Sequence, residues 1–163
     1  GAVYIYLGVL FVARDPQLRH FAEEHLATET GHLALIEAVV PPPERSRLIV
    51  AWRVAGWFTG ALPALFGPRA VYATIAAVEA FVDRHYAAQI RWIDATDPAR
   101  ADVRLQSLRT LLERCRQDEV SHHDQAVAAM RAHGAGGRVA GIGTALLAGW
   151  ARIVAAGSAG AVA

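Results

Sequence analysis

Residues 116–126 read RQDEVSHHDQA and carry Glu119 and His122 three positions apart. Residues at this spacing lie on one face of an α-helix, so the carboxylate and the imidazole point the same way. The same ExxH pattern occurs at Glu29 and His32. Two copies in one chain are uncommon by chance, and they predict two helices that each direct a glutamate and a histidine into a shared core.

Turn signals divide the rest of the chain into helix-length segments, and the sequence shows no β alternation. Asp15 and Pro16 provide a cap and a first turn for a helix that the prolines at 41–43 end. Short connections favour antiparallel neighbours, so we predict an all-α, ferritin-like antiparallel four-helix bundle with additional apolar helices. The predicted helical segments are 2–13, 16–40, 48–66, 69–94, 99–132 and, in the apolar tail, 138–156.

A third glutamate, Glu79, lies on the inward face of the segment 69–94, at the same depth as Glu29 and Glu119. Three buried carboxylates repel one another, and no arginine lies on the inward faces to neutralise them. Divalent metal ions would neutralise the charge and would also use the imidazoles. Carboxylates and imidazoles without thiolate indicate iron or manganese, and the order Glu…ExxH…Glu…ExxH is that of ferritin-like di-metal proteins.

The first predicted helix, 2–13, does not supply the remaining glutamate of that pattern. Its inward face reads Val3, Tyr6, Leu10 and Ala13. Four residues further back, this face reaches a position two residues before Gly1. We expect a glutamate there in the natural protein, because a di-metal site of this type takes a glutamate from each of two helices besides the two ExxH motifs.

The segment 48–66, LIVAWRVAGWFTGALPALF, is almost uniformly apolar and has Arg53 as its only charge. Its length is borderline for crossing a bilayer, and Arg53 and Pro63 argue against a simple transmembrane helix. Because Trp52 and Trp57 lie near the arginine, we expect a helix that docks in the plane of a membrane surface. A buried or dimer-forming helix is the alternative.

Composition limits the classes of protein that the chain fits. Its 163 residues make one domain, 1–163, with a substantial core. The formal net charge of +1 gives no support to a nucleic-acid partner. Cys115 is the single cysteine, so we expect no internal disulfide and a reducing compartment, with this thiol packed in the core.

Three stretches resemble the demethoxyubiquinone hydroxylase family of ubiquinone biosynthesis: GAVYIYLG at 1–8, the segment 52–91, and residues 116–126. The segment 52–91 is the most specific, since it resembles the family's apolar helix, glycine-rich turn and VE…HY…QIR core. The family's first ligand glutamate lies two residues before its Gly-Ala pair, in agreement with the position expected from the inward face. The resemblance extends from Gly1 to about Met130.

Several roles follow from this resemblance alone. It implies a centre of two iron ions in which Glu29 and Glu119 bridge and Glu79 is a terminal ligand. His85 and Tyr86 match the family's HY pair and are implied to lie near the metals and the quinone; for His85 a surface or interface position is the alternative. The implied iron ligands are Glu29, His32, Glu79, Glu119 and His122.

Two further polar residues are interpreted from their positions. Asp118 either orients a ligand imidazole from the neighbouring helix or is a solvated acid. His25 lies on the inward face one turn before Glu29, matches no ligand position, and is interpreted as a core histidine.

The implied activity is O₂-dependent hydroxylation of a prenylated demethoxy-quinone or quinol, with NADH as an electron source that is not tightly bound. The substrate implies a peripheral membrane protein on the cytoplasmic side of the bacterial inner membrane, or on the matrix side in mitochondria. A lipid-binding accessory protein and a homodimer are further expected partners. The alternatives are a ferritin-like iron-oxidising or storage bundle, and a metal-free quinone-binding accessory protein.

Overall fold

The computed structural model describes residues 1–40 and 48–134, which form five α-helices and no strand. The predicted all-α helical bundle is therefore confirmed, whereas the predicted segment 138–156 lies outside the described residues. The helices are α1 (Ala2–Val12), α2 (Pro16–Val39), α3 (Ile49–Ala64), α4 (Pro68–Thr96) and α5 (Val103–Gly134).

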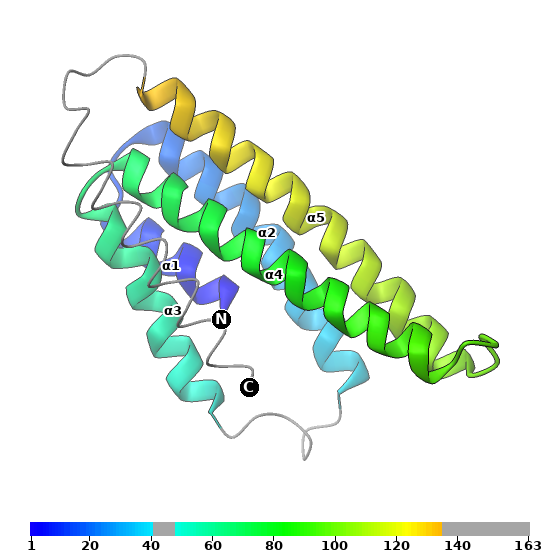
Figure 1. Cartoon of the computed structure of the whole chain (residues 1–163). Coiled ribbons are helices and arrows are strands. Elements are labelled where there is room, and N and C mark those ends of the chain that lie inside the picture. Colours follow the sequence, from blue (N-terminus) through cyan, green and yellow to red (C-terminus); the bar gives the residue numbers. More distant parts are fainter. Residues whose placement is uncertain (41–47, 135–163) are drawn as a thin grey trace.

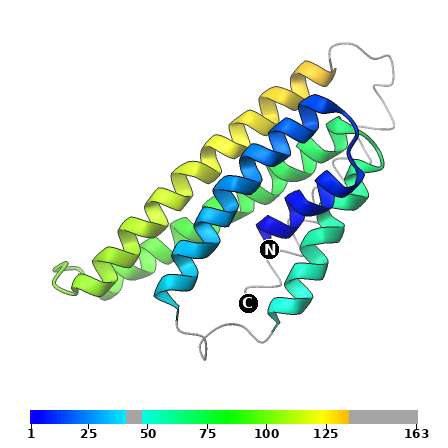
Figure 2. The same cartoon turned by 180° about the vertical axis from the view of Figure 1, so that it is seen from behind.

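Two helical hairpins form the body of the molecule. Helices α1 and α2 make one hairpin, and the long helices α4 and α5 make the other (Figure 1). Helix α3 carries the chain from the first hairpin to the second and packs beside α1, as both views show (Figure 2). The ExxH motifs therefore lie on α2 and α5, the second helix of each hairpin.

The turn between α1 and α2 is held by the residues that the sequence pattern singled out. The side chain of Asp15 accepts a hydrogen bond of 2.8 Å from the backbone N–H of Leu18, and Pro16 occupies the first turn. The guanidinium of Arg19 donates to the carbonyl oxygens of Leu10 and Ala13, which lie at the end of α1. These bonds satisfy backbone groups that a helix end leaves free.

Helix α5 begins at Val103, later than the expected start at residue 99. The carboxylate of Asp97 accepts from the backbone N–H groups of Ala101 and Asp102, at 2.9 and 3.1 Å. Asp102 in turn accepts from the N–H of Arg104 at 2.8 Å. Residues 98–102 are therefore held as a turn, because aspartate side chains compete with helical hydrogen bonding.

Apolar layers close the core at both ends and leave a polar middle. The residues at one end come from α1, α2, α4 and α5, and those at the other end from α4 and α5. The first layer includes Ile5, Val9, Leu18, Val71 and Ile75; the second contains Ile90, Ile93 and Leu112. This order, apolar at the ends and polar between, is the one read from the inward faces.

Helix α3 lies against α1 at backbone distance. A Cβ atom on Gly60 would overlap the carbonyl oxygen of Ile5, and one on Gly8 would overlap the carbonyl oxygen of Trp57. Trp57 packs on Phe11 of α1, with ring centroids 5.4 Å apart. On the opposite side of α3 large apolar side chains face outward, and Val54 and Phe58 are 53% and 49% exposed. None of the helices in the described ranges is long and apolar enough to span a bilayer.

Candidate metal centre

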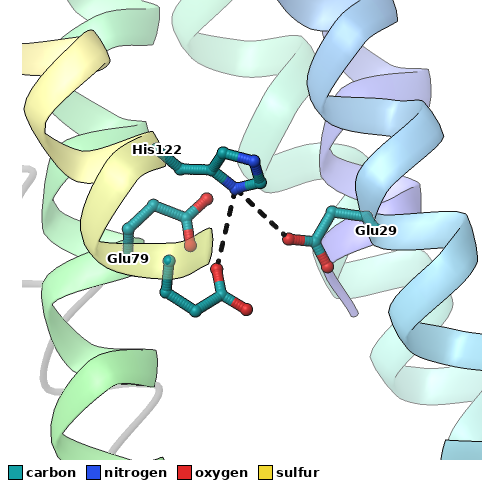
Figure 3. Close-up of side chains that lie close together, drawn as sticks. Glu29, Glu79 and His122 are labelled. Atoms are coloured by element: carbon teal, nitrogen blue, oxygen red, sulfur yellow. Dashed lines mark ion pairs between the residues drawn. The ribbon is translucent and has the colours of Figure 1, made fainter. Parts of the chain in front are cut away.

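Four side chains from three helices meet in the polar middle of the core. Glu29 comes from α2, Glu79 from α4, and Glu119 and His122 from α5. All four are buried, and each offers one oxygen or nitrogen atom within 4.8 Å of those of the others. Figure 3 shows His122 and Glu29 facing each other across the core with Glu79 beside them.

His32 adds a fifth side chain to this cluster. Its Nδ1 atom lies 3.6 Å from Glu119 Oε1 and 3.9 Å from Glu29 Oε1. The Nδ1 atom of His122 lies 3.8 Å from the other oxygen of Glu119, Oε2, and 3.7 Å from Glu29 Oε1. The two oxygens of Glu119 thus face two different imidazoles, which is the placement that a carboxylate shared by two metal ions requires.

The hydrogen bonding of the cluster is incomplete in a way that fits metal ions. A buried polar atom without a hydrogen-bond partner costs about 1–3 kcal/mol, so folded chains rarely keep several together. Each of the five residues nevertheless has one. These atoms are Glu29 Oε1, His32 Nδ1, Glu79 Oε2, Glu119 Oε2 and His122 Nδ1. Carboxylate oxygens and imidazole nitrogens without thiolate suit iron or manganese.

The three carboxyl groups do not ionise alike. Burial, followed by the charge of Glu119, raises the pKa of Glu29 to about 8. Burial, followed by the proton shared with the adjacent Glu119 carboxylate, raises the pKa of Glu79 well above its ordinary value. Burial also acts to raise the pKa of Glu119, but the imidazoles of His122 and His32 and the Glu79 carboxyl lower it to about 2. Glu119 is therefore the carboxyl group that ionises first, while Glu29 and Glu79 hold their protons, as expected for acids that share a site.

Asp118 contacts a histidine of the cluster from outside. Its Oδ2 atom lies 2.9 Å from Nε2 of His32. With its Nε2–H donated to this carboxylate, the imidazole can give up its Nδ1 proton and offer that nitrogen's lone pair to a metal ion beside Glu119 and Glu29. Of the two interpretations open for Asp118, the contact favours the orienting one.

A second polar network reaches the cluster from α1. The hydroxyl of Tyr6 donates to Glu79 Oε1 at 2.8 Å and lies 3.1 Å from Nδ1 of His25. His25 Nε2 lies 3.1 Å from Gln125 Oε1, and the His25 ring stacks on that of His122, with centroids 4.0 Å apart. Tyr6 stood on the predicted inward face without a role, and Gln125 was not singled out.

The two residues of the HY pair, His85 and Tyr86, have different surroundings. Tyr86 is partly buried, and its pKa is raised by burial and then by the charge of Glu119, so its phenol stays protonated near the cluster. The ring of His85 lies nearly parallel to that of Phe81, with centroids 6.1 Å apart. The structure thus brings Tyr86 towards the five-residue cluster and leaves His85 beside Phe81.

The fold and the cluster define a class of protein: helical bundles whose core holds carboxylates and imidazoles on ExxH helices, as in ferritin-like di-metal proteins. Within this class, the chain belongs to the family described as Ubiquinone biosynthesis protein COQ7, which it matches over residues 1–140. The family resemblance read from the sequence is confirmed.

Three curated relatives show how far the similarity extends. The chain is 30% identical over 142 residues to the mitochondrial 5-demethoxyubiquinone hydroxylase of Saccharomyces cerevisiae, covering 78% of this chain and 59% of the relative. It is 31% identical over 126 residues to the human mitochondrial NADPH-dependent 3-demethoxyubiquinone 3-hydroxylase, and 33% identical over 132 residues to the 3-demethoxyubiquinol 3-hydroxylase of Rhodospirillum rubrum. Each of these two matches covers 76% of this chain and 56% of the relative.

The chain thus spans between half and two thirds of the length of these relatives. No solved structure matches it significantly. The name of the human relative specifies NADPH, whereas the sequence resemblance led us to expect NADH.

Proposed function

We propose that the chain is the catalytic domain of an O₂-dependent demethoxyubiquinone hydroxylase with a di-iron centre. The observation that carries the proposal is the position of Glu119, whose two oxygens face His32 and His122 at 3.6 and 3.8 Å. A mononuclear or purely structural site has no need of a carboxylate placed between two imidazoles. The names of the relatives supply the substrate class.

The five cluster residues would hold the iron. Glu29 and Glu119 lie between the two imidazoles and are the proposed bridging ligands, and Glu79 is the proposed terminal ligand beside His122. Bound iron supplies the O₂ activation that no side chain provides. The chain's own contribution is to fix the ligands from three helices, to keep Nδ1 of His32 free through Asp118, and to exclude water through the apolar layers of the core.

Tyr86 and His85 are proposed to serve the quinone. The Tyr86 phenol is protonated and close enough to Glu119 to be influenced by its charge, so it can donate a hydrogen bond to a ring oxygen of a substrate beside the cluster. His85 is partly buried one residue earlier on α4. Its role requires the substrate to reach the Phe81 side of the helix.

The outward face of α3 is the proposed membrane contact. It exposes Val50, Val54, Phe58 and Leu62, which are spaced at steps of four residues and lie on one side of the helix. A prenylated quinone resides in the bilayer, so a helix lying in the interface places the domain where its substrate is. We accordingly propose a peripheral membrane protein on the cytoplasmic or matrix face, with 48–66 as its docking segment.

The remaining partners follow from the same activity. A reduced nicotinamide nucleotide is the proposed electron source, and a lipid-binding accessory protein or a second copy of the chain would assist access to the quinone. A ferritin-like storage bundle is the competing function. It is disfavoured by the apolar outward face of α3, since a storage protein needs a charged exterior, and by the names of the relatives.

The test is turnover with metal counting. The iron-loaded chain is incubated with O₂, a reductant and a short-chain demethoxy-quinone in detergent, and the product is analysed by mass spectrometry. We expect one oxygen atom to be added to the quinone, with about two irons bound per chain, and no addition by Glu119→Ala. An unmodified quinone with continued uptake of iron beyond two per chain would support storage instead.

A further inference from the structure

The two ExxH motifs are supported differently. In one motif, the residue before the glutamate is Asp118, which holds the histidine of the other motif, His32, at 2.9 Å. The corresponding residue before Glu29 is Thr28, whose hydroxyl donates to the carbonyl oxygen of Glu24 on its own helix. His122 thus has no counterpart of Asp118 at this position. It has instead the ring of His25 stacked on it, at 4.0 Å and an interplanar angle of 26°.

His25 also reaches Glu79, through Tyr6. A phenol has one proton, and Tyr6 donates it to Glu79 Oε1. The contact of 3.1 Å between the phenol oxygen and His25 Nδ1 is then a hydrogen bond that Nδ1–H donates. The remaining ring nitrogen, Nε2, then carries a lone pair and lies 3.1 Å from the side-chain amide of Gln125. With that amide turned so that its N–H₂ donates to Nε2 and its oxygen accepts from the Ser121 hydroxyl, every polar atom of the buried His25 ring has a partner.

The bond from Tyr6 decides which oxygen of Glu79 is available. Oε1 is occupied by the phenol, whereas Oε2 is buried and has no hydrogen-bond partner. Glu79 therefore offers a single oxygen to the group of four residues whose ligand atoms lie within 4.8 Å of one another. Both residues that His25 influences, Glu79 and His122, belong to this group, and His32 does not.

We propose that His25 is a positioning residue for one of the two metal positions: its ring fixes the plane of His122, and its Nδ1–H, acting through Tyr6, holds Glu79 as a ligand with one free oxygen. This inference rests on the metal site of the proposed function and goes beyond it, since it assigns separate supports to the two positions. Asp118 supports the position at His32, and the His25–Tyr6 pair supports the position at His122.

Two substitutions separate the two contacts of His25. His25→Phe keeps a ring to stack on His122 and removes the N–H, whereas His25→Asn keeps an amide N–H near the place of Nδ1 and removes the ring. Tyr6→Phe removes the bond to Glu79 directly. His20→Phe is the control, because it lies on the same helix with its side chain 74% exposed. These four variants and the double variant His25→Phe, Tyr6→Phe are compared with the unchanged full chain.

The measurement is titration of the metal-free protein with Co²⁺, following its visible absorption, alongside the melting temperature without metal. We expect His25→Phe and Tyr6→Phe each to weaken binding at one position by about 10–100-fold and to change its absorption bands, as loss of an outer hydrogen-bond partner does. The double variant should be no weaker than the weaker single one, since both act on the same bond. His25→Asn, which removes the ring stacked on His122, should also weaken binding at that position, and His20→Phe should match the unchanged chain.

A purely structural role would look different. If His25→Phe, His25→Asn and Tyr6→Phe lower the melting temperature without metal, yet bind Co²⁺ with unchanged affinity and absorption, the proposal is wrong. Additive effects of His25→Phe and Tyr6→Phe would overturn the route through Tyr6. Failure of the unchanged chain to bind Co²⁺ would overturn the metal site itself, whereas normal binding without quinone hydroxylation would overturn only the proposed activity.

Discussion

Asp118 and His32 lie on different helices, yet Oδ2 of the aspartate is 2.9 Å from Nε2 of the histidine. Asp118 immediately precedes Glu119, which faces the opposite nitrogen of the same ring at 3.6 Å. Two adjacent residues of α5 therefore face the two nitrogens of a histidine on α2, one at hydrogen-bond distance and one across the space for a metal ion. These contacts link the two hairpins at the site itself.

The first prediction concerns this contact. Asp118→Ala should weaken metal binding at the position beside His32 by about 10–100-fold, because the imidazole loses the partner that fixes its tautomer and orientation. Isothermal titration with Co²⁺ measures the change. Asp124→Ala is the control, since Asp124 lies on the same helix with its side chain 75% exposed. Equal affinities for the two variants would contradict the orienting role.

The second prediction concerns the stabilisation that metal provides. Glu119→Gln should lose most of the rise in melting temperature that Fe²⁺ or Co²⁺ gives, because the residue between the two imidazoles no longer carries charge. A metal present at about 100 times its dissociation constant stabilises a fold by about 2.7 kcal/mol. Glu113→Gln, which alters only a partly exposed ion pair with Arg116, should keep the full rise. A preserved rise in Glu119→Gln would argue against this carboxylate as a ligand.

The third prediction is a dependence of metal-free stability on pH. Burial raises the pKa of Glu29 to about 8, and the Glu119 and Asp118 carboxylates, outweighing burial, raise that of His32 to about 9. Both groups therefore hold their protons more tightly in the folded chain. Their contributions are complete below the ordinary values of 4.5 and 6.5 and are lost as pH rises through about 8 and 9. The melting temperature should therefore fall between pH 6.5 and 9.

In the cluster and its neighbour His25, two groups act in the opposite sense, but at lower pH. Glu119, with its pKa lowered to about 2, and His25, with its pKa lowered to about 4, lose their contributions as pH falls. Neither reverses the trend above pH 6.5, the ordinary value for histidine. In Glu29→Gln the melting temperature should fall less over this pH range. Thermal melts of the variant and of the unchanged chain at several pH values measure the difference. A stability that is level or rising over this range would refute the assigned directions.

The fourth prediction concerns the contact between α1 and α3. Gly60→Ala places a methyl group against the carbonyl oxygen of Ile5 and should destabilise the fold by about 1–3 kcal/mol, as overpacking does. Gly31→Ala is the matched substitution, because a Cβ atom there meets nothing within 4 Å on the exposed side of α2. It should stabilise the helix by about 0.5–1 kcal/mol. Chemical unfolding measures the free energy of unfolding of both variants. Similar changes in the two variants would show that Gly60 does not make the close contact with α1.

The fifth prediction concerns the outward face of α3. The double variant Val54→Asp, Phe58→Asp should bind phospholipid vesicles at least about tenfold more weakly, since each apolar side chain withdrawn from a bilayer costs about 1.5–3 kcal/mol. Vesicle flotation measures the change. Val103→Asp on α5, which replaces a side chain that is 77% exposed, should float like the unchanged chain. Equal flotation of all three would remove α3 from the membrane contact.

Much of this arrangement was predictable from residue spacing. The 3.6-residue period brings Glu29 and His32 to one face, and helices of similar depth then bring Glu79 and Glu119 to the same core, as the structure shows. A break before residue 99 was predicted, but its extension to residue 102 was not, because it depends on the Asp97 side chain accepting two backbone N–H groups in place of a helix. Local competition of that kind leaves no periodic signal.

The side-chain contacts of His25 could not be predicted from the sequence either. Periodicity places Tyr6 and His25 on inward faces, but it cannot say that their rings meet, since that depends on the offset between α1 and α2. Gln125 lies next to the buried Ala126 on a helix rich in polar residues, where its position gives no hint of a contact with His25. Side-chain contacts between helices follow from rotation and offset, which only the folded arrangement defines.

The close approach of α3 to α1 places different constraints on the two faces of α3. Because the backbone at Gly8 and Gly60 makes that contact, the large outward side chains of α3 are not needed to hold the helix in place. Exchanges among leucine, valine, isoleucine and phenylalanine on this face should be tolerated, whereas the two glycines should remain fixed. Descendants of this chain could adapt to bilayers of different thickness or headgroup without altering the buried cluster.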